Sequence, residues 1–271
     1  MPFVRTPGAT LFVTEAGSPE RPAILFSNSL GTTHRMWDAV VDDLAVDHRC
    51  VRYDTRGHGS SRMASASWDM DDLADDAIAI LDNLGIATAH FAGLSLGGMV
   101  GQALASRYPE RLRSLTLLAT AALMPPPERW RDRADLVRRD GMASVEAQSL
   151  ERWFTPGFAA RDPGRVSAAG RELRSLDPMG YAAACEAIAS ADLRERLGTI
   201  AVPTSVVAGQ DDPATPPAMV RELHEAIRGS GWTLMSPAAH LIAIERPGEV
   251  AEHLRSVCGA ADREGRAAAV A

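Results

Sequence analysis

A serine framed by glycines, in the segment Gly93-Leu94-Ser95-Leu96-Gly97, constrains this chain more than any other feature. The segment ends an apolar, strand-like run over residues 89–94 and begins a helical pattern that continues to about Tyr108. A serine on a tight strand-to-helix turn needs glycines two residues before and after it, because side chains there would collide with the flanking backbone. The hydroxyl then stands beside a helix N-terminus, where backbone N–H groups face a developing negative charge. The segment predicts a nucleophilic Ser95, and its structural alternative is a glycine-rich turn needed only for close packing.

Strand-length apolar runs alternate with amphipathic helical segments in both end portions of the chain, which is typical of a mostly parallel sheet with flanking helices. The predicted strands are residues 11–15, 23–28, 49–53, 89–94, 112–119, 204–208 and 233–235. The first two are predicted to form an opening antiparallel pair. The pattern indicates an α/β fold.

The alternation stops between residues 122 and 195, where arginine, alanine and helical spacing dominate. A sheet-forming chain with one all-helical insert predicts an α/β core that carries a helical cap. We assign residues 1–121 and 196–258 to the core and residues 122–195 to the cap. The alanine-rich tail, residues 259–271, has no apolar stripe and is expected to be disordered.

Composition excludes several classes of function. All 28 basic residues are arginine, which excludes a Schiff-base lysine and a Walker-type phosphate loop. The net charge of −7 and the 5% aromatic content argue against a nucleic-acid surface. Three scattered cysteines and the absence of metal-ligand spacing predict neither a disulfide framework nor a catalytic metal, and we expect no cofactor. No targeting or membrane-spanning pattern is found, so we expect a cytoplasmic protein without membrane contact.

A serine nucleophile requires a base and an acid that orients the base. His240 is the candidate base, because it follows the predicted strand 233–235 late in the chain and precedes the closing helix. The other six histidines stand on helix faces, strand edges or loops and are expected to be structural or solvated. The acid should follow strand 204–208, where Asp211 and Asp212 are adjacent. Asp212 fits the loop better, although either carboxylate could instead cap a turn.

Backbone N–H groups are expected to bind the oxyanion. The loop after strand 23–28 reads Asn28-Ser29-Leu30-Gly31 and stands where a second oxyanion donor is usually found. We therefore expect the amides of Leu30 and Leu96 to be the donors, with Ser29 lining the pocket. A further motif at residues 54–61, Asp-Thr-Arg-Gly-His-Gly-Ser-Ser, lacks phosphate-loop spacing and is predicted to be a structural loop that locks the sheet edge.

The chain resembles the α/β-hydrolase superfamily and, within it, the 3-oxoadipate enol-lactonases of aromatic catabolism. The likeness extends over residues 23–257, and the superfamily part comprises residues 52–59 and the serine turn. The segments that match the enol-lactonases are residues 27–32, 36–38, 93–102, 130–133, 141–142, 151–156, 180–181, 185–188 and 192–194. One departure follows the histidine, where that family usually has Leu-Ser-Asn and this chain has Leu241-Ile242-Ala243.

The resemblance implies a cofactor-free serine hydrolase that opens a small carboxylated lactone through an acyl-serine, with 3-oxoadipate enol-lactone as the substrate in the β-ketoadipate pathway. Trp130 and Arg133 are one helical turn apart, so an indole and a guanidinium can share one face toward the substrate carboxylate. Trp153 lies in another matching cap segment and is a further candidate for substrate binding. The alternatives are a carboxylesterase or thioesterase acting on another small ester, and a non-catalytic ligand-binding protein of this fold.

Overall fold

The computed structural model describes residues 2–65 and 67–270. Within these residues the strands form one nine-stranded sheet of order β1-β2-β4-β3-β6-β7-β8-β9, with β5 paired to β2. The strands are β1 Phe3–Arg5, β2 Ala9–Ala16, β3 Ala23–Ser27, β4 Arg49–Tyr53, β5 Arg62–Met63, β6 Ala89–Leu94, β7 Leu112–Leu118, β8 Thr204–Gly209 and β9 Gly231–Met235. From β4 to β9 every neighbouring pair is parallel. Strands β3, β6 and β8 are buried at every position, as expected for parallel strands covered on both faces.

The predicted opening antiparallel pair is wrong. Strand β2 pairs antiparallel with β4, while β3 pairs parallel with β4 on its other edge. Strand β4 therefore lies between β2 and β3. The turn at residues 17–22 joins two strands that run in opposite directions but are not neighbours, and local sequence cannot distinguish this from a hairpin.

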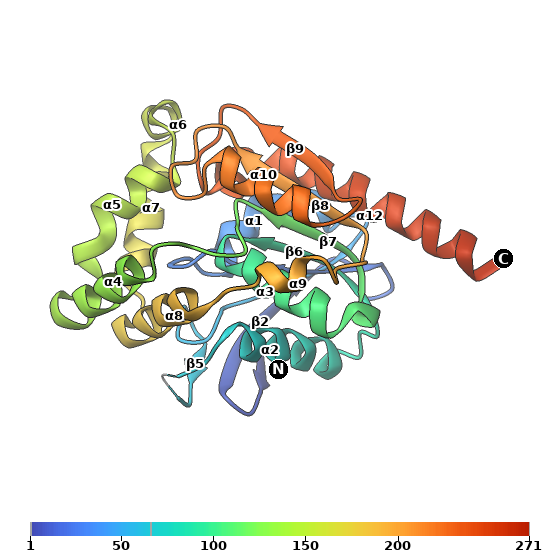
Figure 1. The fold of residues 1–271 in the computed structure, drawn as a ribbon, viewed down its shortest axis with the longest axis horizontal. Coiled ribbons are helices and arrows are strands. Elements are labelled where there is room, and N and C mark those ends of the chain that lie inside the picture. Colours follow the sequence, from blue (N-terminus) through green and yellow to red (C-terminus); the bar gives the residue numbers. More distant parts are fainter. Residues whose placement is uncertain (1, 66, 271) are drawn as a thin grey trace.

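Helices cover both faces of the sheet (Figure 1). Helix α1 (Asp38–Leu44) packs against α12 (Pro247–Val270), and α2 (Met70–Asn83) packs against α3 (Leu96–Arg107). Helix α10 (Pro217–Ala226) lies against β8 and β9. Helix α2 begins where it does because Asp69 and Asp72 form a reciprocal capping box.

The segment between β7 and β8 is helical and lies at one end of the sheet, on the left in Figure 1. Its main helices are α4 Pro127–Asp140, α5 Glu146–Trp153, α6 Pro156–Arg161, α7 Pro163–Arg174 and α8 Pro178–Ser190. Four of these five begin with proline, whose fixed φ and missing N–H suit the first helical position. The short helix α9 (Arg194–Leu197) then leads back to the sheet.

Residues 259–270, which the composition predicts to be disordered, form the end of helix α12 in the structure (Figure 1). Its extension is anchored by Ala261, which is buried, and by Asp262, whose carboxylate lies 3.1 Å from the Arg113 guanidinium. Composition alone missed these tertiary contacts; Ala271 lies outside the described residues. Among the described helices, none combines the length and the hydropathy that spanning a lipid bilayer requires.

Candidate active site

Ser95 stands on a strained turn between β6 and α3. Its φ of 57° and ψ of −113° lie outside the usual regions for a residue with a side chain. The conformation is held from β7, because the Ser95 N–H donates to the Leu118 carbonyl at 2.9 Å and the Thr120 hydroxyl donates to the Ser95 carbonyl at 2.7 Å. Such strain persists only where the surroundings impose it, and it marks functional positions.

The flanking glycines are needed for backbone contact. A Cβ on Gly93 would lie 2.1 Å from the Gly97 carbonyl oxygen, and a Cβ on Gly97 would lie 2.2 Å from the Ser27 carbonyl oxygen. These are contacts with backbone atoms, which cannot move aside as a flexible side chain can. Gly93 is thus required by the tightness of the turn itself, and Gly97 by the close approach of β3 to the turn.

We expect Gly97→Ala to lower the free energy of unfolding by about 1–3 kcal/mol, the range of overpacking in a closely packed interior. Urea unfolding measures this change, and activity should fall with it because the turn must shift. Gly248→Ala is the matched control, since Gly248 is also the second residue of its helix and a Cβ there meets nothing within 4 Å. That variant should be as stable as the parent or more stable. Equal unfolding energies for the two variants would contradict the packing argument.

His240 and Asp212 are brought together from the loops after β9 and β8. The His240 Nδ1 lies 2.8 Å from the Asp212 Oδ2, and both side chains are buried. An N–H at Nδ1 donated to the carboxylate leaves Nε2 as the ring nitrogen available to a nucleophile. The pair has the geometry of a base oriented by an acid.

Asp212 is held as an anion by its neighbours. Burial alone raises the pKa of its carboxyl, but His240 and the hydrogen bonds from Thr215 outweigh burial, and the net pKa is lowered. The Thr215 hydroxyl donates to Oδ2 at 2.6 Å and the Thr215 N–H donates to Oδ1 at 3.1 Å, while the Ala214 N–H also donates to Oδ1 at 2.7 Å. Asp211, by contrast, is exposed and accepts a bond from the Ala238 N–H at 3.2 Å. Of the two candidates, Asp212 is the one that meets the imidazole.

The sheet register places the serine near this pair. Leu94 is in register with Leu118, and Gly209 is in register with Met235, at the carboxyl ends of four adjacent parallel strands. Carboxyl ends of parallel strands meet at one edge, where ligands of open α/β sheets bind. Ser95 is the next residue after β6, so it stands at the same edge as Asp212 and His240.

The two predicted oxyanion donors lie on segments that are tied together. The Gly97 N–H donates to the Asn28 carbonyl at 2.9 Å, which fixes the loop after β3 against the start of α3. The Asn28 side-chain amide forms its hydrogen bonds within the core, where it donates to the Tyr53 carbonyl at 2.6 Å and accepts from the Trp37 indole at 3.1 Å. Among the described residues, no acceptor is found for the amides of Leu30 and Leu96. Both are therefore available to a ligand.

Sequence reasoning missed Glu245, which fastens the histidine loop to the helical segment. This buried carboxylate accepts bonds from the Ala239 N–H at 2.7 Å and from the Thr155 N–H at 2.5 Å. The Leu241 N–H also donates to the Trp153 carbonyl at 3.0 Å. The sequence feature that could have identified it is a glutamate in an apolar stretch, five residues after His240.

Arg133 reaches from α4 to two other helices. Its guanidinium donates to the Tyr181 hydroxyl at 2.7 Å, the Gln148 Oε1 at 2.8 Å and the Ser149 hydroxyl at 2.6 Å. All three acceptors are neutral, and in the described part of the chain Arg133 forms no ion pair with a carboxylate within 4 Å. The arrangement suits an anionic ligand and also ties the helices together.

A second guanidinium, that of Arg152 on α5, is half-buried and makes no hydrogen bond or ion pair within the described residues. Burial lowers its pKa, and the neighbouring charges of Arg129 and Arg133 lower it further. The Arg152 carbonyl lies 3.4 Å from the His240 N–H. The helical segment thus presents clustered positive charge close to the histidine loop.

The remaining predicted substrate residues differ in their surroundings. Trp130 is half-buried and donates from its indole to the Met124 carbonyl at 2.9 Å. Trp153 is buried beside Gly31, with its Cζ2 3.2 Å from the position a Cβ would take there. Ser29 is also buried, next to the Leu30 amide.

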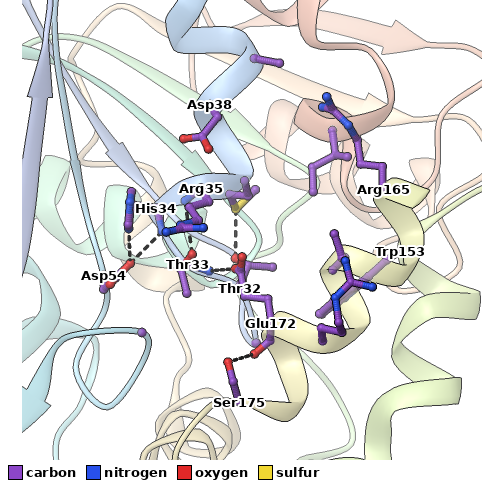
Figure 2. A pocket seen from close by; sticks show the side chains of 18 of the residues that line it. Thr32, Thr33, His34, Arg35, Asp38, Asp54, Trp153, Arg165, Glu172 and Ser175 are labelled. Atoms are coloured by element: carbon purple, nitrogen blue, oxygen red, sulfur yellow. Dashed lines mark hydrogen bonds and ion pairs between the residues drawn. The ribbon is translucent and has the colours of Figure 1, made fainter. Parts of the chain in front are cut away.

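A cavity of about 830 Å³ lies between the loop after β3 and helix α7. Its wall includes His34, Arg35, Asp38, Trp153, Arg165 and Glu172, so side chains of both signs of charge line it (Figure 2). Neither Ser95 nor His240 lines this cavity. Its lining does include Gly31, the residue after Leu30, and Trp153.

A mostly parallel sheet covered by helices, with a serine turn and a histidine–aspartate pair at one edge, is the arrangement of an α/β hydrolase. Comparison with known proteins leads to the same class. A family model described as the alpha/beta hydrolase fold matches residues 22–247. The chain belongs to this family.

Its relatives narrow the class further. The chain is 39% identical over 231 residues to 3-oxoadipate enol-lactonase 2 of Acinetobacter baylyi, covering 85% of this chain and 86% of that protein. It is 37% identical over 240 residues to 3-oxoadipate enol-lactonase 1 of the same organism, covering 89% and 90%. The crystal structure of the enol-lactonase from Burkholderia xenovorans LB400 superposes with a TM-score of 0.91 at 37% identity, covering 94% of this chain and 99% of that one. By fold and relationship the chain is an ester hydrolase of this family.

Proposed function

We propose that the protein hydrolyses a small carboxylated lactone, 3-oxoadipate enol-lactone, to the open keto acid. The observation that carries the proposal is the buried His240–Asp212 pair at the sheet edge where the strained Ser95 turn stands. The similarity to proteins named 3-oxoadipate enol-lactonases supports the choice of substrate. The unbalanced guanidinium of Arg133 supports an anionic one.

The proposed reaction has two stages. Ser95 attacks the lactone carbonyl while the His240 Nε2 takes the hydroxyl proton, and Asp212 stabilises the imidazolium that forms. The Leu30 and Leu96 amides bind the oxyanion. The ring C–O bond breaks, the leaving oxygen receives the proton from His240, and the resulting enol becomes a ketone. A water activated by His240 then attacks the acyl-serine, which releases the dicarboxylic keto acid and restores the Ser95 hydroxyl.

The test of this proposal is an assay of purified protein with 3-oxoadipate enol-lactone, with the open acid identified by mass spectrometry. We expect kcat/KM of at least about 10⁴ M⁻¹ s⁻¹, the lower end for an enzyme with its own substrate. Rapid hydrolysis of aryl esters without turnover of the lactone would instead indicate a carboxylesterase of the same chemistry. No labelling by a fluorophosphonate and no turnover of any ester would indicate a non-catalytic protein.

Arg133→Ala is expected to lower kcat/KM for the carboxylated lactone. The loss should correspond to about 1.5–3 kcal/mol of transition-state stabilisation, the scale of a charge-assisted hydrogen bond. The same variant should affect hydrolysis of a neutral aryl acetate much less, because that ester lacks the carboxylate arm. The comparison of the two substrates measures the charge contribution separately from any loosening of the helices that Arg133 joins.

Two further arginine variants complete this experiment. Arg131→Ala, on the same helix but exposed and paired with Glu128 at 3.6 Å, is the control and should leave both rates unchanged. If Arg133→Ala lowers both rates equally, Arg133 is structural. If neither rate moves and Arg152→Ala lowers the lactone rate alone, Arg152 is the carboxylate-binding residue.

A further inference from the structure

We propose that His58 is a positioning residue that holds the oxyanion-binding loop in its working conformation. Its Nε2 lies 3.2 Å from the Gly31 nitrogen and accepts the Gly31 N–H. Gly31 directly follows Leu30, whose amide is a proposed oxyanion donor. The inference rests on the proposed function in that it takes the Leu30 amide as this donor.

The tautomer of His58 is set by its other nitrogen. Nδ1 lies 3.1 Å from the Arg56 carbonyl oxygen, which can only accept, so Nδ1 carries the proton and Nε2 keeps its lone pair. Burial lowers the pKa of the imidazole despite the opposing effects of the Arg56 carbonyl, Asp54 and Asp177. At neutral pH the ring is therefore neutral and able to accept the Gly31 N–H.

The loop that carries His58 is itself rigid. Arg56 forms a buried ion pair with Asp76, in which its Nη2 lies 2.9 Å from Oδ1 and its Nε also contacts the carboxylate. Asp54 accepts the Ser60 N–H and the His34 N–H, each at 2.8 Å. The loop at residues 54–61, which the sequence predicts to lock the sheet edge, therefore also holds the His58 Nε2 in place as an acceptor for the oxyanion loop.

Gly31 is confined on its other side by the helical segment. It has a φ of +82°, and a Cβ there would lie 2.9 Å from a methyl of Leu173 and 3.1 Å from the ring of Tyr181. The Gly31 peptide thus fits between the His58 ring and the helices. Without its acceptor, the buried N–H would be left unpaired, and the loop would be expected to turn toward another partner.

Two amide variants separate the two hydrogen bonds of His58. The glutamine side chain in His58→Gln can place an oxygen near the position of Nε2 and accept from Gly31. The shorter side chain in His58→Asn can replace only the donor at Nδ1 that serves the Arg56 carbonyl. If His58 acts through Gly31, His58→Asn should lower kcat about 10- to 100-fold, with KM within about threefold, since oxyanion contacts act mainly in the transition state. His58→Gln should keep kcat within about fivefold of the parent.

His90→Asn is the control for loss of a buried histidine. His90 lies in β6 and its Nδ1 is 2.8 Å from the Ser114 hydroxyl, away from the oxyanion loop. We expect this variant to lower the melting temperature but to leave kcat unchanged. All variants are assayed with both the lactone and a neutral aryl ester, so that a wrong choice of lactone does not obscure the effect of His58.

Two outcomes would overturn the inference. One is an unchanged kcat in a folded His58→Asn variant, and the other is an equal loss of kcat in the asparagine and glutamine variants, which would indicate a purely structural role. Nitrogen NMR of the parent protein gives a test independent of variant folding. It should show the neutral Nδ1–H tautomer of His58 at pH 7, and an Nε2–H tautomer would overturn the inference.

Discussion

Ser95→Ala should abolish turnover of the lactone, lowering kcat by about 10⁴-fold or more while the protein stays folded. The reason is that the serine oxygen forms the covalent bond in both proposed stages, and removal of a nucleophile of this kind usually leaves only the residual effect of binding and the oxyanion hole. The side chain is small and half-exposed, so its loss removes little packing. Steady-state kinetics together with thermal unfolding measure both halves of this expectation.

A loss of kcat below about tenfold, at an unchanged melting temperature, would exclude Ser95 as the nucleophile. Active-site labelling gives a second readout. A fluorophosphonate should react with the parent protein at one site and not at all with the alanine variant. Labelling of the variant at the parent rate would place the reactive nucleophile elsewhere.

Asp212→Asn is expected to lower kcat by roughly 10³- to 10⁴-fold. The backbone N–H groups that bind Oδ1 would hold the amide oxygen there, so that the NH₂ group would donate to Nδ1 and favour the wrong tautomer of His240. Asp211→Asn should stay within about tenfold of the parent. Asp211 is exposed and contacts the Ala238 backbone rather than the imidazole. The two variants carry the same chemical change at adjacent positions, and only Asp212 meets the base.

Kinetics of the two variants side by side decide the assignment. Equal losses, or a larger loss in Asp211→Asn, would make Asp211 the orienting acid. Buried Asp212 also accepts hydrogen bonds from Thr215 and the Ala214 N–H, so some loss of stability in Asp212→Asn is expected. A urea unfolding curve shows whether that loss accounts for the fall in activity.

Local patterns were sufficient for most of the fold. The predicted strand at residues 49–53 coincides with β4, and the strand at 89–94 coincides with β6. Strand β6 is buried at every position, so its nearly continuous apolar run stands out in the sequence, and β4 has an apolar core between its two arginines. The serine turn could be predicted for the same reason, since its glycines are required by contacts only a few residues apart or with the neighbouring strand.

Pairing between distant segments was beyond the reach of such patterns. No local feature of the sequence specifies that β2 pairs with β4 rather than with β3, because strand register and strand neighbours are set by packing over the whole sheet. For a related reason, the composition did not predict that α12 extends to Val270. Its alanines have no amphipathic stripe, yet Ala261 and Asp262 are anchored by contacts with the core that no window of the sequence contains.

By itself, the sequence determined the α/β class, the helical insert, the Ser95 turn and the candidate His240, because each depends on residue types at short spacing. Only the tertiary structure decided that Asp212 rather than Asp211 meets His240, that Arg133 has three neutral partners, and that His58 holds Gly31. These are contacts of side chains with other side chains or, for His58, with the backbone of another segment. Their existence depends on distances of about 3 Å, which the folded backbone sets and which residue order alone does not contain.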